Sequence, residues 1–385
     1  MPRHPEVAQS VAAVAGSVYS GLAHRLASHE GEVYPLHVGD TWMEPPEGCR
    51  MEDLTVAEHP GMHRYARPHG MPALLDALVE RLRPRFGIPV EPDEILIAAG
   101  ATGGLGAVVG ALVDPGDEVL IAAPHWPLIA GIVRSFHGKP VPVPLVEEPE
   151  IRSPEDAVEA MERHVGERTA ALYLSTPNNP TGRVIPKSWL EALAAWARAK
   201  DLWILTDEVY EDYVYDGEHA YTRPLAPERT FSIHSFSKAL GMAGNRVGYV
   251  VGPAEVMRDV LKVSTHTFYS APTAGQLAAL KALEGPAEPW ITQARETYAK
   301  LGRDAAQRLG VEPPAGSTFL FLDVADRLDD RGLGGFLEDC VDRGLLVAPG
   351  PSFGPYPTHL RLCFTSAKPE VVERGVGVLA DLLGR

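Results

Sequence analysis

The chain has few cysteines and no long apolar run. Its three cysteines, Cys49, Cys340 and Cys363, lie far apart and form no Cys-x-x-Cys pair. This spacing fits neither a disulfide framework nor a zinc motif, so we expect a reducing compartment and no metal site. No stretch approaches the roughly 20 apolar residues of a membrane span, and residues 1–20 lack the compact apolar core of a signal peptide. We therefore expect a cytoplasmic protein.

Positive charge is also scarce. The sequence has 35 Lys and Arg residues against 51 Asp and Glu, which gives a formal net charge of -16. So acidic a balance argues against a general affinity for nucleic acid or anionic membranes. It does not exclude an anionic cofactor, because the local field of a pocket decides that binding. With 385 residues, the chain is long enough for two domains with buried cores.

Short apolar runs alternate with helix-like stretches from about residue 70 onward. The runs are bounded by Gly, Pro and Asp, which is typical of buried strands, and stretches such as 71–85, 103–112 and 187–199 predict helices between them. This alternation predicts an α/β fold with a mostly parallel sheet covered on both faces. The predicted strands are Ile95–Ala99, Glu118–Ala122, Ala170–Leu174, Leu202–Thr206, Thr230–His234 and Val247–Val251.

The two ends of the chain predict a second, smaller α/β unit. We place the boundary at Gly285-Pro286, which gives a large domain of residues 41–285 and a small domain of residues 1–40 and 286–385. The elements predicted for the small domain are a helix over 5–29, an extended segment over 34–38, a long helix over 289–310, strands over 319–324 and 360–364, and helices near 332–343 and 369–383.

A glycine-rich segment, Gly100-Ala-Thr-Gly-Gly-Leu-Gly106, follows a predicted strand and opens a helix. It is similar to the dinucleotide loop of short-chain dehydrogenases. However, the next predicted strand ends in Ala-Pro without an acidic residue for a ribose, and no Tyr is followed four residues later by Lys. The narrower prediction is that Gly100, Ala101 and Thr102 form a phosphate-binding turn at the positive end of a helix.

Four later segments each lie at or just beyond a predicted strand end, where open α/β sheets bind ligands. They are Thr176–Gly182, Thr206–Tyr210, Ser235–Gly241 with Gly244–Gly248, and Leu360–Leu362. Their residue types match the needs of pyridoxal 5'-phosphate (PLP): an amine for a Schiff base, a carboxylate for the ring nitrogen, donors to the phenolic oxygen and a phosphate cup. Neighbouring cations would lower the pKa of the amine. The candidates, in that order, are Lys238; Asp207; Asn179 and Tyr210; and Ser235, Ser237 and Arg246.

The order and spacing of these motifs resemble those of the class I/II aminotransferases over nearly the whole chain. The resemblance implies PLP fold type I, with a mostly parallel sheet of the seven-stranded type in the large domain. It also implies that Trp126 stacks on the cofactor ring, and that Arg361 grips the substrate α-carboxylate with help from Asn179 and the backbone of Gly39. Tyr65 resembles the tyrosine that reaches the phosphate of the neighbouring subunit's PLP, which implies a homodimer.

The resemblance implies a ping-pong transfer of an amino group from an L-amino acid to a 2-oxo acid, with Lys238 as the general acid–base. Other chemistries stay open: a β-lyase of the same fold, a non-catalytic ligand sensor, or a dehydrogenase that uses the Gly100 loop. Taken singly, each site residue also has a structural explanation. Asp207 could cap a helix, Asn179 could form a turn and Trp126 could be a core residue.

Two features bear on the substrate. One branch of aspartate aminotransferases has an arginine three residues before a Tyr-Ser-Asn-Pro segment, where this chain has His266 before Tyr269-Ser-Ala-Pro272. This difference argues against a dicarboxylate bound in that way. Trp42 and Met43, just after Gly39, would bring apolar bulk toward a neutral or aromatic substrate, although Trp42 could instead pack between the domains.

Overall fold

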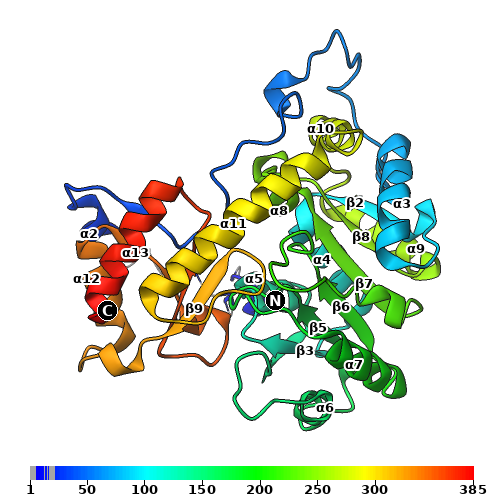
Figure 1. Cartoon of the computed structure of the whole chain (residues 1–385). Coiled ribbons are helices and arrows are strands. Elements are labelled where there is room, and N and C mark those ends of the chain that lie inside the picture. The colour runs from blue at the N-terminus through cyan, green and yellow to red at the C-terminus, as the bar shows by residue number, and fades with distance from the viewer. Residues whose placement is uncertain (1–5, 13, 15, 17–21) are drawn as a thin grey trace.

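The computed structural model describes residues 6–12, 14, 16 and 22–385. Its centre is a seven-stranded sheet with the spatial order β2-β8-β7-β6-β5-β3-β4, covered by helices on both faces (Figure 1). The order of strands β3 to β7 requires crossover connections, as expected for an α/β fold. The strands are β2 (Ile95–Ala98), β3 (Glu118–Ala123), β4 (Lys139–Pro144), β5 (Thr169–Ser175), β6 (Trp203–Asp207), β7 (Thr230–Ser235) and β8 (Gly248–Val251).

The sheet is mostly parallel, and each of its predicted strands is present within about a residue of the predicted bounds. Only β8 runs antiparallel to both of its neighbours, β7 and β2. Strands β2, β5 and β6 are almost continuously buried. Near-continuous burial explains why these strands read as apolar runs without alternation.

Strand β4 is the one strand of this sheet that the apolar pattern misses. Its sequence, Lys-Pro-Val-Pro-Val-Pro, contains Pro140, Pro142 and Pro144. Proline cannot donate to a ladder, so a strand with this composition is confined to an edge. Indeed β4 pairs only with β3, at the end of the sheet.

Alternating side chains of the strands enter different cores on the two faces of the sheet. On one face they pack against α4 (Gly100–Leu112), α5 (Pro127–Ser135) and α9 (Ala254–Thr267). The opposite face is covered at one end by α6 (Pro154–Glu162) and α7 (Lys187–Ala199). At its other end lie α3 (Pro72–Phe86), α8 (Phe236–Ala239) and α10 (Thr273–Leu283).

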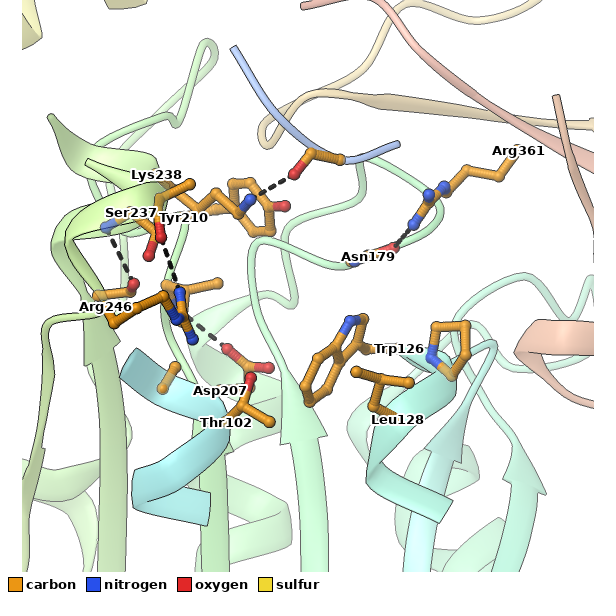
Figure 2. Close-up of a pocket in the computed structure, with 16 residues that line it drawn as sticks. Thr102, Trp126, Leu128, Asn179, Asp207, Tyr210, Ser237, Lys238, Arg246 and Arg361 are labelled. Atoms are coloured by element: carbon orange, nitrogen blue, oxygen red, sulfur yellow. Dashed lines mark hydrogen bonds between the residues drawn. The ribbon is translucent and has the colours of Figure 1, made fainter. Parts of the chain in front are cut away.

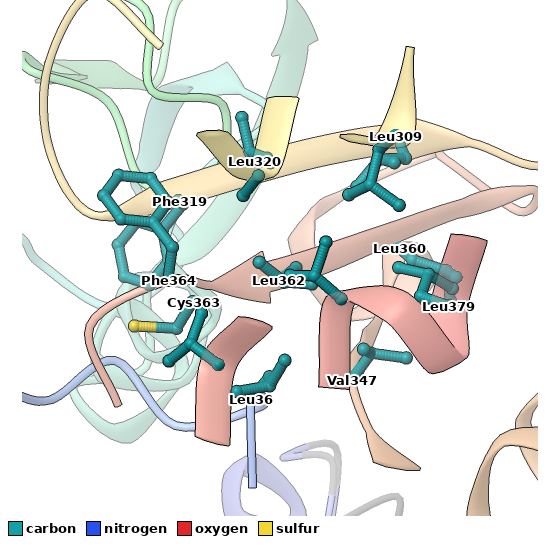
Figure 3. Packing of buried hydrophobic residues seen from close by; sticks show 14 of the residues in the cluster. Leu36, Leu309, Phe319, Leu320, Val347, Leu360, Leu362, Cys363, Phe364 and Leu379 are labelled. Carbon is teal, nitrogen blue, oxygen red and sulfur yellow. The ribbon is translucent and has the colours of Figure 1, made fainter. Parts of the chain in front are cut away.

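A smaller unit has its own core around the sheet β11-β12-β9 (Figure 3). The long helix α11 (Ala287–Leu309) runs from beside α10 into this unit (Figure 1). Leu36 of the N-terminal part is buried in the same core, next to the pairing of β1 with β10. The other elements are β1 (Tyr34–Pro35), β9 (Phe319–Asp323), β10 (Leu345–Leu346), β11 (Ala348–Pro349), β12 (His359–Cys363), α2 (Ala23–Ala27), α12 (Gly332–Asp342) and α13 (Pro369–Leu383).

The N-terminal prediction was wrong in its described part. One helix was predicted over 5–29, but the structure has α1 (Gln9–Ala12) and α2, and Val14 and Gly16 between them are not helical. Glycine and β-branched residues both disfavour a helix, which accounts for the break. The remainder of that prediction, residues 5, 13, 15 and 17–21, lies outside the described residues. The extended segment over 34–38 is also shorter, because a turn begins at Leu36.

Among the described residues, no helix has the combination of length and apolar character needed to cross a membrane.

Candidate active site

A cavity of about 290 Å³ opens beyond the ends of β5, β6 and β7. Its walls come from both units of the chain and carry one lysine, two arginines and one aspartate (Figure 2). The lining residues are Gly39, Ala101, Thr102, Trp126, Pro127, Leu128, Asn179, Asp207, Val209, Tyr210, Ser235, Ser237, Lys238, Ala243, Arg246 and Arg361.

Lys238 lies in α8, the short helix that follows β7. Ser235 caps this helix by accepting a hydrogen bond from the backbone N–H of Ser237 at 3.1 Å. The Nζ atom of Lys238 donates to the carbonyl oxygen of Gly39 (Figure 2). Burial lowers the pKa of the Lys238 amine, and the nearby Arg361 and Arg246 lower it further. The cations contribute as predicted, and desolvation, which disfavours the charged form of a buried amine, is the larger cause.

Asp207 is the last residue of β6 and is almost fully buried. Its Oδ2 accepts a hydrogen bond from the Tyr173 hydroxyl at 2.9 Å, and its Oδ1 accepts one from the backbone N–H of Val209 at 3.4 Å. Burial raises the pKa of the Asp207 carboxyl to about 6, although both hydrogen bonds oppose the rise. A nearby positive charge inside the cavity would favour the ionised form.

One side of the cavity is suited to a phosphate group. Gly100, at the start of α4, has a φ of +73°, and a Cβ there would collide with the guanidinium of Arg246. Arg246 is held by hydrogen bonds to the carbonyls of Ala243 at 2.8 Å and Ala99 at 3.4 Å. The guanidinium, the first backbone N–H groups of α4 and the side chain of Thr102 thus lie together, as in helix-terminal anion sites.

Arg361 lies on the opposite side of the cavity from Arg246 (Figure 2). Its Nη1 donates to Oδ1 of Asn179 at 2.9 Å, and its Nη2 donates to the carbonyl of His37 at 2.6 Å. The guanidinium also lies over the rings of Phe319 and Phe353, at 4.4 and 4.8 Å from their centroids. Aromatic rings and carbonyls on this side hold the guanidinium in place, so that it is oriented before a carboxylate binds.

Of the residues predicted from sequence, all but Gly100 and Tyr65 line the cavity. Gly100 nevertheless adjoins the cavity, because a Cβ added to it would collide with the Arg246 guanidinium. Tyr65 is 86% exposed, and it lies beside Tyr269 in a separate hollow formed by residues 62–66 and 268–273. Trp42 does not line the cavity. It packs edge-on against Tyr298 with 5.7 Å between the ring centroids, at the margin of the smaller core.

Met43 packs against the same core as Trp42. The prediction that Trp42 and Met43 bring apolar bulk toward the substrate therefore has no support from the structure. Sequence patterns also missed several residues of the site, among them Leu128, Val209, Ala243 and Tyr173. Leu128 and Val209 lie within two residues of predicted positions and could have been found from that proximity. Tyr173 could not, because its contact depends on the register of two strands.

These features fit PLP. The cavity offers a buried amine of lowered pKa, a carboxylate on its floor, the Trp126 ring on one wall and cationic groups at opposite sides (Figure 2). An anionic phosphate suits the Arg246 side, and an amino acid carboxylate suits Arg361. The glycine segment at Gly100 therefore serves the same cavity as Lys238.

Comparison with known proteins identifies the family. The family model described as aminotransferase class I and II matches residues 34–379. An aspartate/prephenate aminotransferase of Thermus thermophilus is 33% identical over 362 residues, which are 92% of each chain. An arginine–pyruvate transaminase of Pseudomonas aeruginosa is 34% identical over 368 residues, again 92% of each chain. The solved structure of a double mutant of the Thermus thermophilus aspartate aminotransferase superposes with a TM-score of 0.89 at 30% identity, covering 98% of this chain and 100% of that one.

The chain therefore belongs to the class I and II aminotransferases. It is a PLP-dependent enzyme that transfers an amino group between an amino acid and a 2-oxo acid. The fold class, the cofactor and the reaction predicted from sequence are confirmed. Family membership excludes the dehydrogenase and the non-catalytic sensor.

Proposed function

We propose that Lys238 carries the cofactor and then moves a proton at the substrate Cα, in a ping-pong transfer from an L-amino acid to a 2-oxo acid. The observation that carries this proposal is the position of the Lys238 amine in one cavity with Asp207, Arg246 and Arg361. Bound PLP supplies a conjugated ring that accepts the electron pair left at Cα. The lowered pKa of Lys238 favours a neutral amine, which can accept that proton.

Four residues are proposed to contact the cofactor ring. Asp207, ionised against the ring nitrogen, keeps that nitrogen protonated. Tyr210 is buried and burial raises its pKa, so its hydroxyl stays protonated and can donate to the phenolic oxygen. The Asn179 carbonyl oxygen accepts from Arg361, which leaves its amide N–H₂ to donate to the same phenolic oxygen. Trp126 would stack on the ring.

We assign the phosphate to the Arg246 side of the cavity. The proposed groups are Ala101, Thr102, Ser235, Ser237 and Arg246, with Gly100 giving the close approach of the backbone. The substrate α-carboxylate is assigned to Arg361, which can offer a planar pair of donors, with Asn179 and the backbone of Gly39 beside it.

The assembly is proposed to be a homodimer in which Tyr65 completes the neighbouring subunit's phosphate site. Its 86% exposure supports this, since an exposed aromatic beside a hollow is typical of an interface. We also propose the division into a large domain of residues 41–285 and a small domain of residues 1–40 and 286–385, supported by the start of α11 at Ala287. A cytoplasmic location is proposed because the three cysteines are unpaired.

The lysine assignment is tested by borohydride reduction of the enzyme with PLP, followed by peptide mapping. The cofactor should be fixed to the peptide that contains Lys238. Lys238→Ala should lower the rate of amino transfer by about 10²–10⁴-fold, the usual worth of a positioned acid–base group. A screen of amino donors against several 2-oxo acids measures that rate and also defines the substrates.

Lys187→Ala is a matched control, because Lys187 is an exposed lysine paired with Glu191. It should behave as the unmodified enzyme. Label on another lysine, or normal turnover by Lys238→Ala, would refute the assignment. Release of ammonia and pyruvate without formation of the pyridoxamine form of the cofactor would instead indicate lyase chemistry.

A further inference from the structure

Asp207 is contacted from beneath the cavity by a tyrosine that does not line it. Tyr173 lies in β5, and the β5–β6 register pairs Ser175 with Asp207 and Tyr173 with Leu205. Because side chains alternate along a strand, Tyr173, Ser175 and Asp207 lie on the same face of the sheet. This register brings the Tyr173 hydroxyl to 2.9 Å from Oδ2 of Asp207.

The surroundings of Tyr173 favour this hydrogen bond. The side chain is completely buried in the core beneath α4 and α5. Burial and the adjacent Asp207 charge raise the pKa of the phenol well above its usual value, so the hydroxyl keeps its proton. A buried phenol beside a carboxylate donates to it because an unpaired buried hydroxyl costs free energy and a hydrogen bond to a charged acceptor is strong.

The two oxygens of Asp207 are therefore in different environments. Among the described residues, Oδ2 accepts from the Tyr173 hydroxyl, whereas Oδ1 accepts only from the Val209 N–H at 3.4 Å. Asp207 also lines the cavity. A hydrogen bond fixed to one oxygen sets the plane of the carboxylate, and it stabilises the ionised form.

Other titratable groups also face Asp207. His234 in β7 favours the ionised carboxylate and Glu208 disfavours it, both through charge. Tyr210 lies close enough to be affected by the Asp207 charge. Tyr173 differs from these three because it donates a side-chain hydrogen bond directly to the carboxylate.

We propose that Tyr173 is a positioning residue for amino transfer, whose hydroxyl holds the Asp207 carboxylate ionised and oriented toward the ring nitrogen of PLP. The proposal rests on the assignment of Asp207 to that nitrogen. Tyr173 thus acts on the cofactor through Asp207, without touching the cofactor or the substrate.

The test is Tyr173→Phe, which removes one oxygen and preserves the packing. The readouts are the dissociation constant of PLP for the apoprotein and the pH dependence of the bound cofactor's absorbance. Loss of a hydrogen bond to a charged group should weaken PLP binding about 10-fold at neutral pH. The pH below which PLP affinity falls should move up by about one unit, because the carboxylate protonates more easily.

Tyr356→Phe is the matched control. The Tyr356 hydroxyl donates to Oε1 of Glu148 at 3.2 Å, so the change removes the same atom from a phenol–carboxylate pair outside the cavity. It should alter neither readout. In an Asp207→Asn background, Tyr173→Phe should cause no further shift of the pH profile. A full second shift there would mean that Tyr173 does not act through Asp207.

Replacement of Tyr173 with fluorotyrosine keeps the hydroxyl and avoids dependence on whether Tyr173→Phe folds. Fluorine makes the phenol a stronger donor, so the pH profile should move downward. An unchanged profile in both variants would overturn the role of Tyr173 while leaving that of Asp207 intact. If Asp207→Asn itself left PLP affinity and absorbance unchanged, the functional assignment of Asp207 would fall instead.

Discussion

At the scale of single residues, the position of Asp207 opposes the stability of the apoprotein at neutral pH. The ordinary pKa of this carboxyl is 3.8, and burial raises it to about 6 in the folded chain. Between these values the folded state binds more protons than the unfolded state, so the free energy of unfolding falls as the pH rises from about 4 to 6. The shift corresponds to about 3 kcal/mol at pH 7.

Asp207→Asn should therefore stabilise the apoprotein at pH 7 by up to about 3 kcal/mol, and the difference should vanish below about pH 4. Urea unfolding of both apoproteins at these two pH values measures this effect. Asp216→Asn, the same change at an exposed carboxylate, is the control for the substitution itself. If Asp207→Asn were equally stable relative to the native chain at both pH values, the raised pKa would be wrong.

At the scale of elements, the first residues of α4 bring their backbone close to the phosphate side of the cavity. Gly100→Ala adds two penalties: a left-handed backbone with a side chain, and a Cβ where the Arg246 guanidinium lies. The backbone penalty is about 1–2 kcal/mol of stability. Displacement of Arg246 should in addition weaken PLP binding about 10-fold, since a charged hydrogen bond is lost.

Gly87→Ala is the control that carries only the backbone penalty. Gly87 ends α3 with a φ of +66°, and a Cβ there would meet nothing within 4 Å. It should therefore lower the melting temperature to a similar extent without changing PLP affinity. Thermal unfolding of the apoproteins and titration with PLP distinguish the two effects. Equal PLP affinities for the two variants would mean that the approach to Arg246 is unimportant.

The elements could be predicted from sequence where one physical signal dominated. Apolar runs located strands such as β5 and β6, because buried parallel strands have no polar face. The same rule missed β4, whose prolines suit an edge position that only the assembled sheet defines. The single helix predicted over 5–29 was wrong, because the described residues Val14 and Gly16 between α1 and α2 are not helical.

The residues of the candidate site could be predicted from sequence where they belong to local motifs, but not where they depend on long-range contacts. Motifs placed Lys238, Asp207 and Arg361 because each lies within or just beyond a predicted strand, and the structure brings all three to one cavity. The contact of Tyr173 with Asp207 depends on the register of β5 against β6, and register is a property of the folded sheet. Long-range pairs of this kind leave no pattern in a single sequence.

At the scale of the whole molecule, the proposed dimer makes each active site depend on two chains. If Tyr65 serves the neighbouring site, a subunit with Tyr65→Ala and a subunit with Lys238→Ala damage different sites when they pair. One site of the mixed dimer then combines the defects, and the other is intact. The symmetry of a two-fold dimer therefore predicts recovery of activity on mixing.

Each variant alone should bind PLP weakly or turn over slowly. After unfolding and refolding together in equal amounts, about half of the dimers should be mixed, so activity should reach about a quarter of the native value. Amino transfer at limiting PLP measures this recovery, and a mixture refolded separately is the control. If Tyr65 instead served its own subunit, no dimer in the mixture would contain an intact site. The co-refolded sample would then show only the sum of the two damaged enzymes.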